Sequence, residues 1–216
     1  MKRSLLPKLT HEKQLWSRGF LNLAGVDESG RGAWAGPLVA AAVILDKDNA
    51  RIYNVRDSKL VSEKNRNILA KRIKERAIDF AYGIVTCEEI DEMGLQRANL
   101  TVLERALMAL KKPFDFVLID AFKLQLTTPT RSIIKGDRVS VCIAMASILA
   151  KVKRDVLMKK YAKKYPMYYF ADHVGYGTVK HQEAIRDYGI LPIHRKSFRP
   201  INDPSLLEMY RGKRQH

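Results

Sequence analysis

The chain has 216 residues, of which 46% are hydrophobic, so it is long enough to bury a substantial core and is not disordered throughout. Lysine and arginine outnumber aspartate and glutamate by 39 to 23, which gives a formal net charge of +16. This excess favours an anionic partner, either nucleic acid or an acidic membrane surface. The longest apolar stretch, 33–45, is interrupted by Gly36-Pro37 and is shorter than the roughly 20 residues that a membrane helix needs.

The first nine residues contain no sustained apolar region, so we expect no secretory signal. Cys87 and Cys142 lie far apart and outside any CxxC or Cys/His cluster, which is typical of a reduced chain with two incidental thiols. We therefore expect a cytoplasmic protein without a membrane helix. No repeat, low-complexity segment or linker divides the sequence, which favours a single domain.

In chain order, the hydrophobic periodicity predicts alternating helices and strands. A capped helix over 10–18 precedes strands over 21–27 and 37–45, a helix over 62–77 and a strand over 80–86. A helix over 95–110 then leads to strands over 114–120 and 131–135 and to a long helix from residue 137. This order predicts an α/β fold with helices packed on a sheet.

Acidic residues stand where several of these elements end or begin. Asp27 and Glu28 close the first strand, Asp120 closes a later buried strand, and Asp137 opens the long helix. Because ligand sites in α/β sheets gather at the carboxyl ends of strands, the four side chains are placed to converge. Alternate side chains of a strand point to opposite faces, so Glu28 can share an ion with Asp27 only if it lies just past the strand end.

Four carboxylates in one place repel each other unless cations bind them. Mg²⁺ and Mn²⁺ prefer oxygen ligands and bridge them to phosphate oxygens, which is the two-metal arrangement for phosphodiester hydrolysis. Gly30 and Gly32 would let a polymer backbone approach the main-chain amides, with Arg31 facing phosphate. Taken alone, the segment 27–32 is equally compatible with an ordinary acidic turn between strands.

Seven ordered segments between residues 12 and 201 together resemble the ribonuclease HII family, the bacterial type 2 ribonucleases H. They are Asp27-Glu28-Ser29-Gly30-Arg31-Gly32 with Gly36-Pro37, Asp57-Ser58-Lys59, Leu118-Ile119-Asp120, Lys135-Gly136-Asp137, 146–152 with Arg154-Asp155, Gly175-Tyr176-Gly177-Thr178, and His194-Arg195-Lys196-Ser197-Phe198.

The resemblance implies a ribonuclease H-like fold, with a mixed central sheet that begins as an antiparallel meander, helices on both faces and a C-terminal helical extension. It implies one domain over residues 1–216, with a catalytic core over 20–165 and a helical part over 166–216. The implied activity is endonucleolytic cleavage of the RNA strand of RNA/DNA hybrids, with incision 5′ to single ribonucleotides in duplex DNA. Mn²⁺ or Mg²⁺ is the implied cofactor, with 3′-OH and 5′-phosphate ends as products, and we expect a monomer.

The family's functional residues map onto specific positions here. The resemblance implies that the metal-binding, catalytic acids are Asp27, Glu28, Asp120 and Asp137. The resemblance also implies that the Gly30-Arg31-Gly32 segment presents backbone groups to the ribose hydroxyls and that Tyr176 stacks at the junction between RNA and DNA. For Tyr176 taken alone, a buried aromatic is the alternative. Contacts of this kind are required because the 2′-OH distinguishes RNA from DNA at a given sugar.

Asp155 is the competing acid. A continuous helix from Asp137, rising about 1.5 Å per residue, would hold the two acids roughly 27 Å apart, so both could not bind one metal pair. We therefore expect Asp155 to be a structural partner of a neighbouring Lys or Arg.

Three positions depart from the family pattern. Ser29 stands where valine or alanine is common, Ala121 where glycine is common, and Val174 where lysine is common. The last change removes a possible phosphate contact. Other basic residues either contact phosphate or form a solvated face: Lys153, Lys160, Lys164, Arg195, Lys196, Arg199, Arg211, Lys213 and Arg214.

Three alternative functions stay open at this stage. A pair among His173, His181 and His194 could run metal-free RNA cleavage through a cyclic phosphate, although their spacing does not indicate such a pair. The chain could instead be a non-catalytic basic binder of RNA or ribosomes, or another nuclease of the same fold, such as one that cuts four-way DNA junctions. No clamp-binding peptide with paired aromatics is evident in residues 206–216.

Overall fold

The computed structural model describes residues 7–48, 50 and 62–203. The Asp57-Ser58-Lys59 motif and the C-terminal 206–216 segment, with its basic residues, lie outside the described residues. In the described part of the chain no helix is long and apolar enough to cross a membrane.

The chain forms two compact units. The first comprises Met1–Ser29, Val39–Ile84 and Leu100–Val152, and the second comprises Gly30–Leu38, Val85–Asn99 and Lys153–His216. The single domain expected from the sequence stays a prediction.

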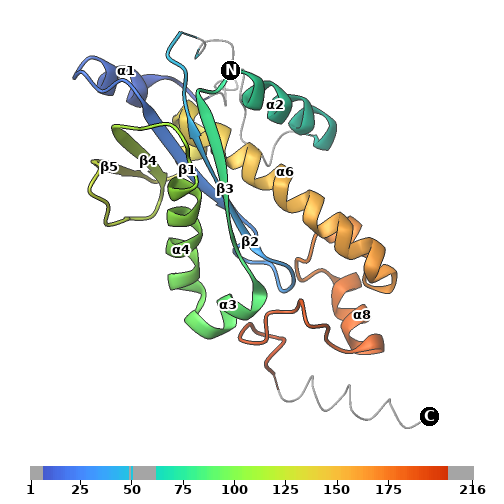
Figure 1. The fold of residues 1–216 in the computed structure, drawn as a ribbon. Helices are drawn as coiled ribbons and strands as arrows, with labels where there is room; N and C mark the ends of the chain where they lie inside the picture. Colours follow the sequence, from blue (N-terminus) through green and yellow to red (C-terminus); the bar gives the residue numbers. More distant parts are fainter. Residues whose placement is uncertain (1–6, 49, 51–61, 204–216) are drawn as a thin grey trace, which may run out of the picture. The chain divides into compact units, whose positions relative to one another are not determined.

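Within the described residues, the sheet has five strands in the order β3-β2-β1-β4-β5 (Figure 1). Strand β1 pairs antiparallel with β2 and parallel with β4, and β4 pairs parallel with β5. The sheet is therefore mixed, which confirms the predicted α/β class. The strands are β1 (Leu23–Ser29), β2 (Leu38–Ile44), β3 (Asp79–Val85), β4 (Phe116–Asp120) and β5 (Thr130–Ile133).

The predicted helices are present, with bounds shifted by a few residues. They are α1 (Thr10–Trp16), α2 (Glu63–Arg76) and α4 (Leu95–Met108), and the one helix predicted from residue 137 is found as two helices, α5 (Gly136–Val139) and α6 (Val141–Lys164). Three further helices were not predicted individually: α3 (Cys87–Met93), α7 (Phe170–His173) and α8 (Val179–Tyr188). Thr86 begins α3 with a capping box, because its hydroxyl accepts from the Glu89 N–H while the Glu89 carboxylate accepts from the Thr86 N–H.

Two boundary predictions are wrong. Strand β1 does not end at Asp27 but continues to Ser29, because its pairing with β2 extends to Ser29 opposite Val39. Glu28 therefore lies within the strand and not just past its end, so the strand bounds do not meet the condition for sharing one ion with Asp27. The two carboxylates are linked instead by charge, because Glu28 contributes to the raised pKa of Asp27. The long helix is not continuous from Asp137, because Ser140 has an extended backbone that separates α5 from α6.

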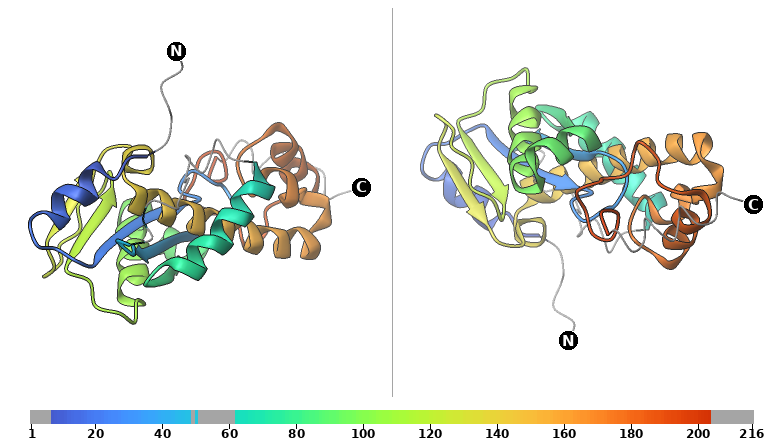
Figure 2. Two further views of the ribbon diagram at one scale, coloured as in Figure 1. Left: turned by 90° about the horizontal axis from the view of Figure 1, so that it is seen from above. Right: turned by 90° about the horizontal axis from the view of Figure 1, so that it is seen from below.

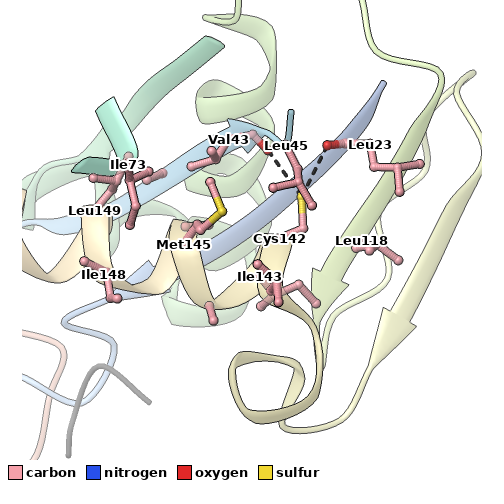
Figure 3. Close-up of a cluster of buried hydrophobic side chains, with 14 of the residues drawn as sticks. Leu23, Val43, Leu45, Ile73, Leu118, Cys142, Ile143, Met145, Ile148 and Leu149 are labelled. Atoms are coloured by element: carbon pink, nitrogen blue, oxygen red, sulfur yellow. Dashed lines mark hydrogen bonds between the residues drawn. The ribbon is translucent and has the colours of Figure 1, made fainter. Parts of the chain in front are cut away.

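Helix α6 packs its first half against one face of the sheet. Figure 3 shows Cys142, Met145 and Leu149 of α6 among side chains from β1, β2, β4 and α2, and the Cys142 thiol contacts the carbonyl oxygens of Leu23 and Val43 at 3.2 and 3.5 Å. Figure 2 shows this part of α6 running along the strands. Helix α4 covers the opposite face, where a Cβ on Gly83 of β3 would overlap the α4 backbone.

A buried carboxylate holds the start of α6. Glu12 of α1 is fully buried, and its Oε1 accepts hydrogen bonds from the Ser140 hydroxyl at 2.6 Å and the Cys142 N–H at 3.0 Å. The Ser140 oxygen accepts in turn from the Ile143 N–H at 3.3 Å. A negative group at this position satisfies free N–H donors and complements the helix dipole, so α1 anchors the N-terminus of α6.

Gly25 sets how closely α6 approaches β1. A Cβ on Gly25 would overlap the main-chain carbonyl of Cys142 and lie 2.8 Å from the Ile143 nitrogen. Backbone atoms cannot rotate away as the end of a side chain can, so a larger residue would displace the helix.

We predict that Gly25→Ala destabilises the protein by about 3 kcal/mol, the upper part of the usual overpacking range. The free energy of unfolding, measured in urea, tests this. Gly32→Ala is the matched control, because no atom lies within 4 Å of a Cβ built at Gly32. Equal stability of the Gly25 and Gly32 variants would contradict the packing argument.

Candidate active site

The parallel pairing of β1 and β4 brings two predicted site acids next to each other. In this pair Val26 lies opposite Ile119, so Asp27 and Asp120 occupy the next positions on neighbouring strands. Asp27 lies two residues beyond Gly25, and Asp120 two residues beyond Leu118, so both side chains point to the face covered by α6. Two of the four acids therefore share one face and one end of the sheet.

Asp27 is in an environment that opposes its charge. The residue is 6% exposed. Its burial raises the pKa of its carboxyl well above the usual value, and the nearby charges of Glu28 and Asp120 raise it further. Two hydrogen bonds to the Asp27 carboxylate lower its pKa and partly offset this rise. One comes from the Ser147 hydroxyl, and the other comes from the Glu28 N–H, whose nitrogen lies 2.8 Å from Oδ1. Ser147 belongs to α6 and was not among the predicted site residues.

A hydrogen bond links Asp120 to the segment that carries the fourth acid. The Gly136 N–H donates to Asp120 Oδ1 at 2.7 Å, and the next residue, Asp137, is 7% exposed at the start of α5. Lys135 enters this turn with a left-handed backbone, φ 56°. Asp137 thus lies in the same compact unit as Asp27, Glu28 and Asp120.

The donor chemistry of these four residues fits a hard divalent cation. All four offer carboxylate oxygens, and the mutual repulsion that raises the pKa of Asp27 is the kind that a bound cation relieves. In the described residues, no three His, Cys, Asp or Glu side chains already stand in a metal-holding arrangement. The fit therefore rests on the ligand type and on the electrostatic link between neighbouring acids.

The Gly30-Arg31-Gly32 segment lies in the second unit, where its two glycines have different surroundings. Gly30 has φ +96°, and a Cβ there would overlap the Arg154 guanidinium. Gly32 is exposed, and no atom lies within 4 Å of a Cβ built there. The protein's own packing thus requires glycine at position 30 and leaves open space at position 32.

Tyr176 also lies in the second unit and is not buried. It is 38% exposed, and the Arg154 guanidinium carbon lies 5.5 Å from its ring centroid. Its N–H donates to the carbonyl of His173 at 2.9 Å. An exposed ring with a fixed backbone is available for stacking, so the alternative of a buried aromatic does not hold.

The three histidines considered for metal-free cleavage do come together, but inside the second unit. His173 stacks on His181 with centroids 4.5 Å apart, and the Nε2 atoms of His181 and His194 are 3.1 Å apart. All three are buried, and burial lowers the pKa of His181 to about 3 and of His194 to about 4. An acid and a base on opposite sides of a substrate bond cannot be built from rings that face each other in a core.

Arg195 was expected to contact phosphate or to belong to a solvated face, and the structure shows neither. It is fully buried, and its guanidinium donates to main-chain carbonyls. Asp155 lies within α6 in the second unit, next to Arg154. Burial lowers the pKa of Arg154, and the negative charge of Asp155 raises it by a smaller amount. No sequence pattern marked Arg195 as an interior residue.

Ala121 and Val174, two of the departures from the family pattern, both have left-handed backbones. Their φ angles are 55° and 43°, a region in which glycine is favoured and a β-branched residue is unusual. The glycine that the family commonly carries after the acid at position 120 is therefore suited to this backbone.

A mixed sheet with Asp27 near the end of β1 and Asp120 at the end of β4 is the arrangement expected of nucleases with a ribonuclease H-like fold. A sequence model of the ribonuclease HII family matches residues 24–201. The ribonuclease HII of Endomicrobium trichonymphae is 49% identical over 194 residues, which are 89% of this chain and 92% of that protein.

Solved structures of related enzymes have the same fold. The crystal structure of ribonuclease H2 from Pyrococcus horikoshii OT3 superposes with a TM-score of 0.74 at 25% identity, covering 90% of this chain and 100% of that one. Bst ribonuclease HIII in complex with Mn²⁺ has a TM-score of 0.65 at 18% identity, covering 90% and 72% of the two chains, and supports the fold alone. The chain belongs to the ribonuclease HII family and is an endoribonuclease that hydrolyses RNA in RNA/DNA hybrids.

We predict that the histidine cluster makes the second unit sensitive to acid. The pKa values of His181 and His194 in the folded state lie below the unfolded value of 6.5. The stability that the protein gains from keeping these rings neutral is therefore complete above pH 6.5 and is lost as the pH falls toward 4. Between pH 7 and pH 5 the two groups together should lower the free energy of unfolding by roughly 3 kcal/mol.

Urea unfolding followed by Trp34 fluorescence, in a Trp16→Phe background, measures this, since the Trp34 ring lies 5.7 Å from His181. His181→Phe keeps a ring beside His173 but cannot be protonated, so it should reduce the pH dependence by about half. The same pH dependence in this variant would contradict the assignment.

Proposed function

We propose that Asp27, Glu28, Asp120 and Asp137 bind two divalent ions, Mg²⁺ or Mn²⁺, and that the enzyme also cuts 5′ to single ribonucleotides in duplex DNA. The observation that carries the proposal is the register of β1 and β4, which sets Asp27 beside Asp120 at one end of the sheet. When bound, the ions would activate the attacking water and stabilise the leaving oxygen, giving 3′-OH and 5′-phosphate ends. Mn²⁺ is included in the proposal because Bst ribonuclease HIII, which has the same fold, was solved in complex with that ion.

The chain's own residues would hold the carboxylates in place. The Ser147 hydroxyl and the Glu28 N–H orient Asp27, and the Gly136 N–H orients Asp120. Supporting hydrogen bonds of this type fix the direction of a ligand's lone pairs, so that little reorganisation is needed when an ion binds.

Ribose recognition is assigned to Gly30-Arg31-Gly32 and Tyr176. The open space at Gly32 supports the close approach of a sugar to the main chain, and the exposed ring of Tyr176 supports stacking at the RNA–DNA junction. The net charge of +16 supports binding to the phosphate backbone. Two free, buried thiols, Cys87 and Cys142, support a cytoplasmic location, which we also propose.

Asp120→Asn should abolish most of the activity without unfolding the protein. The asparagine keeps an Oδ1 that can accept from the Gly136 N–H, but it lacks the charge that binds a cation. Because loss of even an outer-shell partner typically costs about 10- to 100-fold, we expect a loss on the order of 100-fold or more.

The assay uses an end-labelled DNA duplex with one ribonucleotide, in Mg²⁺, Mn²⁺ or chelator, beside an all-DNA duplex. Asp187→Asn on α8, whose partner is the exposed Arg186, is the matched control and should retain full activity. Metal-independent binding without cutting would favour the non-catalytic binder, and cutting of the all-DNA duplex would favour a nuclease of the same fold that does not require a 2′-OH.

Gly32→Ala tests ribose recognition separately from the metal site. Since nothing in the protein meets the added methyl group, the melting temperature should stay unchanged. The methyl group would occupy space assigned to the sugar, and a displacement of about 1 Å at a reacting centre can reduce the rate by about 100-fold. A loss of that order in kcat/KM is expected on the single-ribonucleotide duplex. Unchanged kcat/KM would remove Gly32 from the ribose site.

A further inference from the structure

Two fully buried arginines support the segment 30–38 of the second unit. Buried arginines are rare because desolvating a guanidinium is costly. Arg195 donates from Nε and Nη2 to the Gly36 carbonyl at 3.1 and 2.9 Å, and from Nη1 to the Arg31 carbonyl at 2.9 Å. Its side chain thus binds the central residue of the Gly-Arg-Gly motif directly.

Arg154 holds the same segment from α6. Its Nε and Nη2 donate to the carbonyls of Pro37 and Ala35, both at 3.1 Å, and its Nη1 donates to the carbonyl of Val174 at 2.9 Å. One planar guanidinium therefore joins the segment after the Gly-Arg-Gly motif to the residue two positions before Tyr176.

Arg154 also contacts both proposed ribose-recognition elements. Its guanidinium fills the space that a side chain at Gly30 would need, and it lies 5.5 Å from the Tyr176 ring centroid. Val174, whose carbonyl it binds, has φ 43°, which is unfavourable for a β-branched residue and persists only where surrounding contacts impose it.

The main chain of the same segments is joined as well. The amides of Trp34 and Ala35 donate to the Gly175 carbonyl at 2.8 and 3.2 Å, and the Arg195 amide donates to the Trp34 carbonyl at 2.8 Å. The two guanidiniums thus complete a hydrogen-bond network that joins the 30–38 segment, the 174–176 turn and residue 195.

We propose that Arg154 and Arg195 are positioning residues for ribose recognition: their guanidinium groups hold Gly30-Arg31-Gly32 and Tyr176 in the conformation that receives the substrate. The inference rests on the proposed role of those two segments. Arginine is needed because its rigid fork binds several carbonyls at fixed angles, which a lysine ammonium cannot do. Burial lowers the pKa of Arg195 to about 10, and the positive charge of Arg154 adds to this effect. Two like charges in the interior are unfavourable, and the hydrogen bonds that both guanidiniums donate to carbonyls offset this cost.

The test uses Arg195→Lys and Arg154→Lys, which keep the charge and remove the fork. Two quantities are measured for each variant: steady-state cleavage of the single-ribonucleotide duplex in Mg²⁺, and the Kd for an all-DNA duplex of the same sequence in chelator. We expect kcat/KM to fall about tenfold, mostly through a higher KM, with the Kd for all-DNA unchanged. Arg186→Lys on α8, where the side chain is exposed, is the matched control and should match the unaltered enzyme.

An unchanged KM in both variants would overturn the positioning role, as would a parallel loss of kcat and DNA binding, which indicates general damage. Failure of both variants to fold, judged by circular dichroism, would make the arginines supports of folding and would also overturn it. If the unaltered enzyme does not cut the ribonucleotide duplex, the proposed function fails and the positioning role fails with it.

Discussion

The parallel pairing of β1 with β4 is the constraint on which the site depends. One register, Val26 opposite Ile119, sets Asp27 beside Asp120, and it does so on the face that α6 covers. Like charges that are buried together repel, so this position is costly unless hydrogen bonds and a cation offset the repulsion. Gly25 allows α6 to come close enough for Ser147 to reach Asp27, and the Gly136 N–H reaches Asp120.

In the second unit the buried charges are positive and have a structural role. Its interior contains two guanidiniums whose N–H groups donate to main-chain carbonyls, so positive charge there serves as a set of rigid donors. The histidine cluster lies in the same unit and adds stacked rings that are uncharged at neutral pH, because burial lowers the pKa of His181 and His194. Acidic side chains would bind ions in one unit, while buried cations shape a backbone surface in the other.

Much of the fold could be predicted from local pattern, and the errors share one cause. Strand and helix cores followed hydrophobic periodicity, but the end of β1 depends on pairing with β2, and the break at Ser140 accompanies a hydrogen bond to Glu12, which is 128 residues distant. Helix α3 was missed although Thr86 and Glu89 form a capping box that the sequence contains. Local propensity does not include contacts between distant segments, so boundaries are the least predictable feature.

The sequence by itself determined which acids lie near the carboxyl ends of strands, where glycines flank Arg31, and which family the chain resembles, because these features depend on residue type and order. Only the tertiary structure decided the surroundings of each polar side chain. Tyr176 and Arg195 both looked like candidates for nucleic-acid contact, yet one is exposed and the other is buried against the Arg31 carbonyl, 164 residues away in the chain. Whether a polar group can be buried depends on the partners that folding supplies, and those partners come from distant parts of the chain.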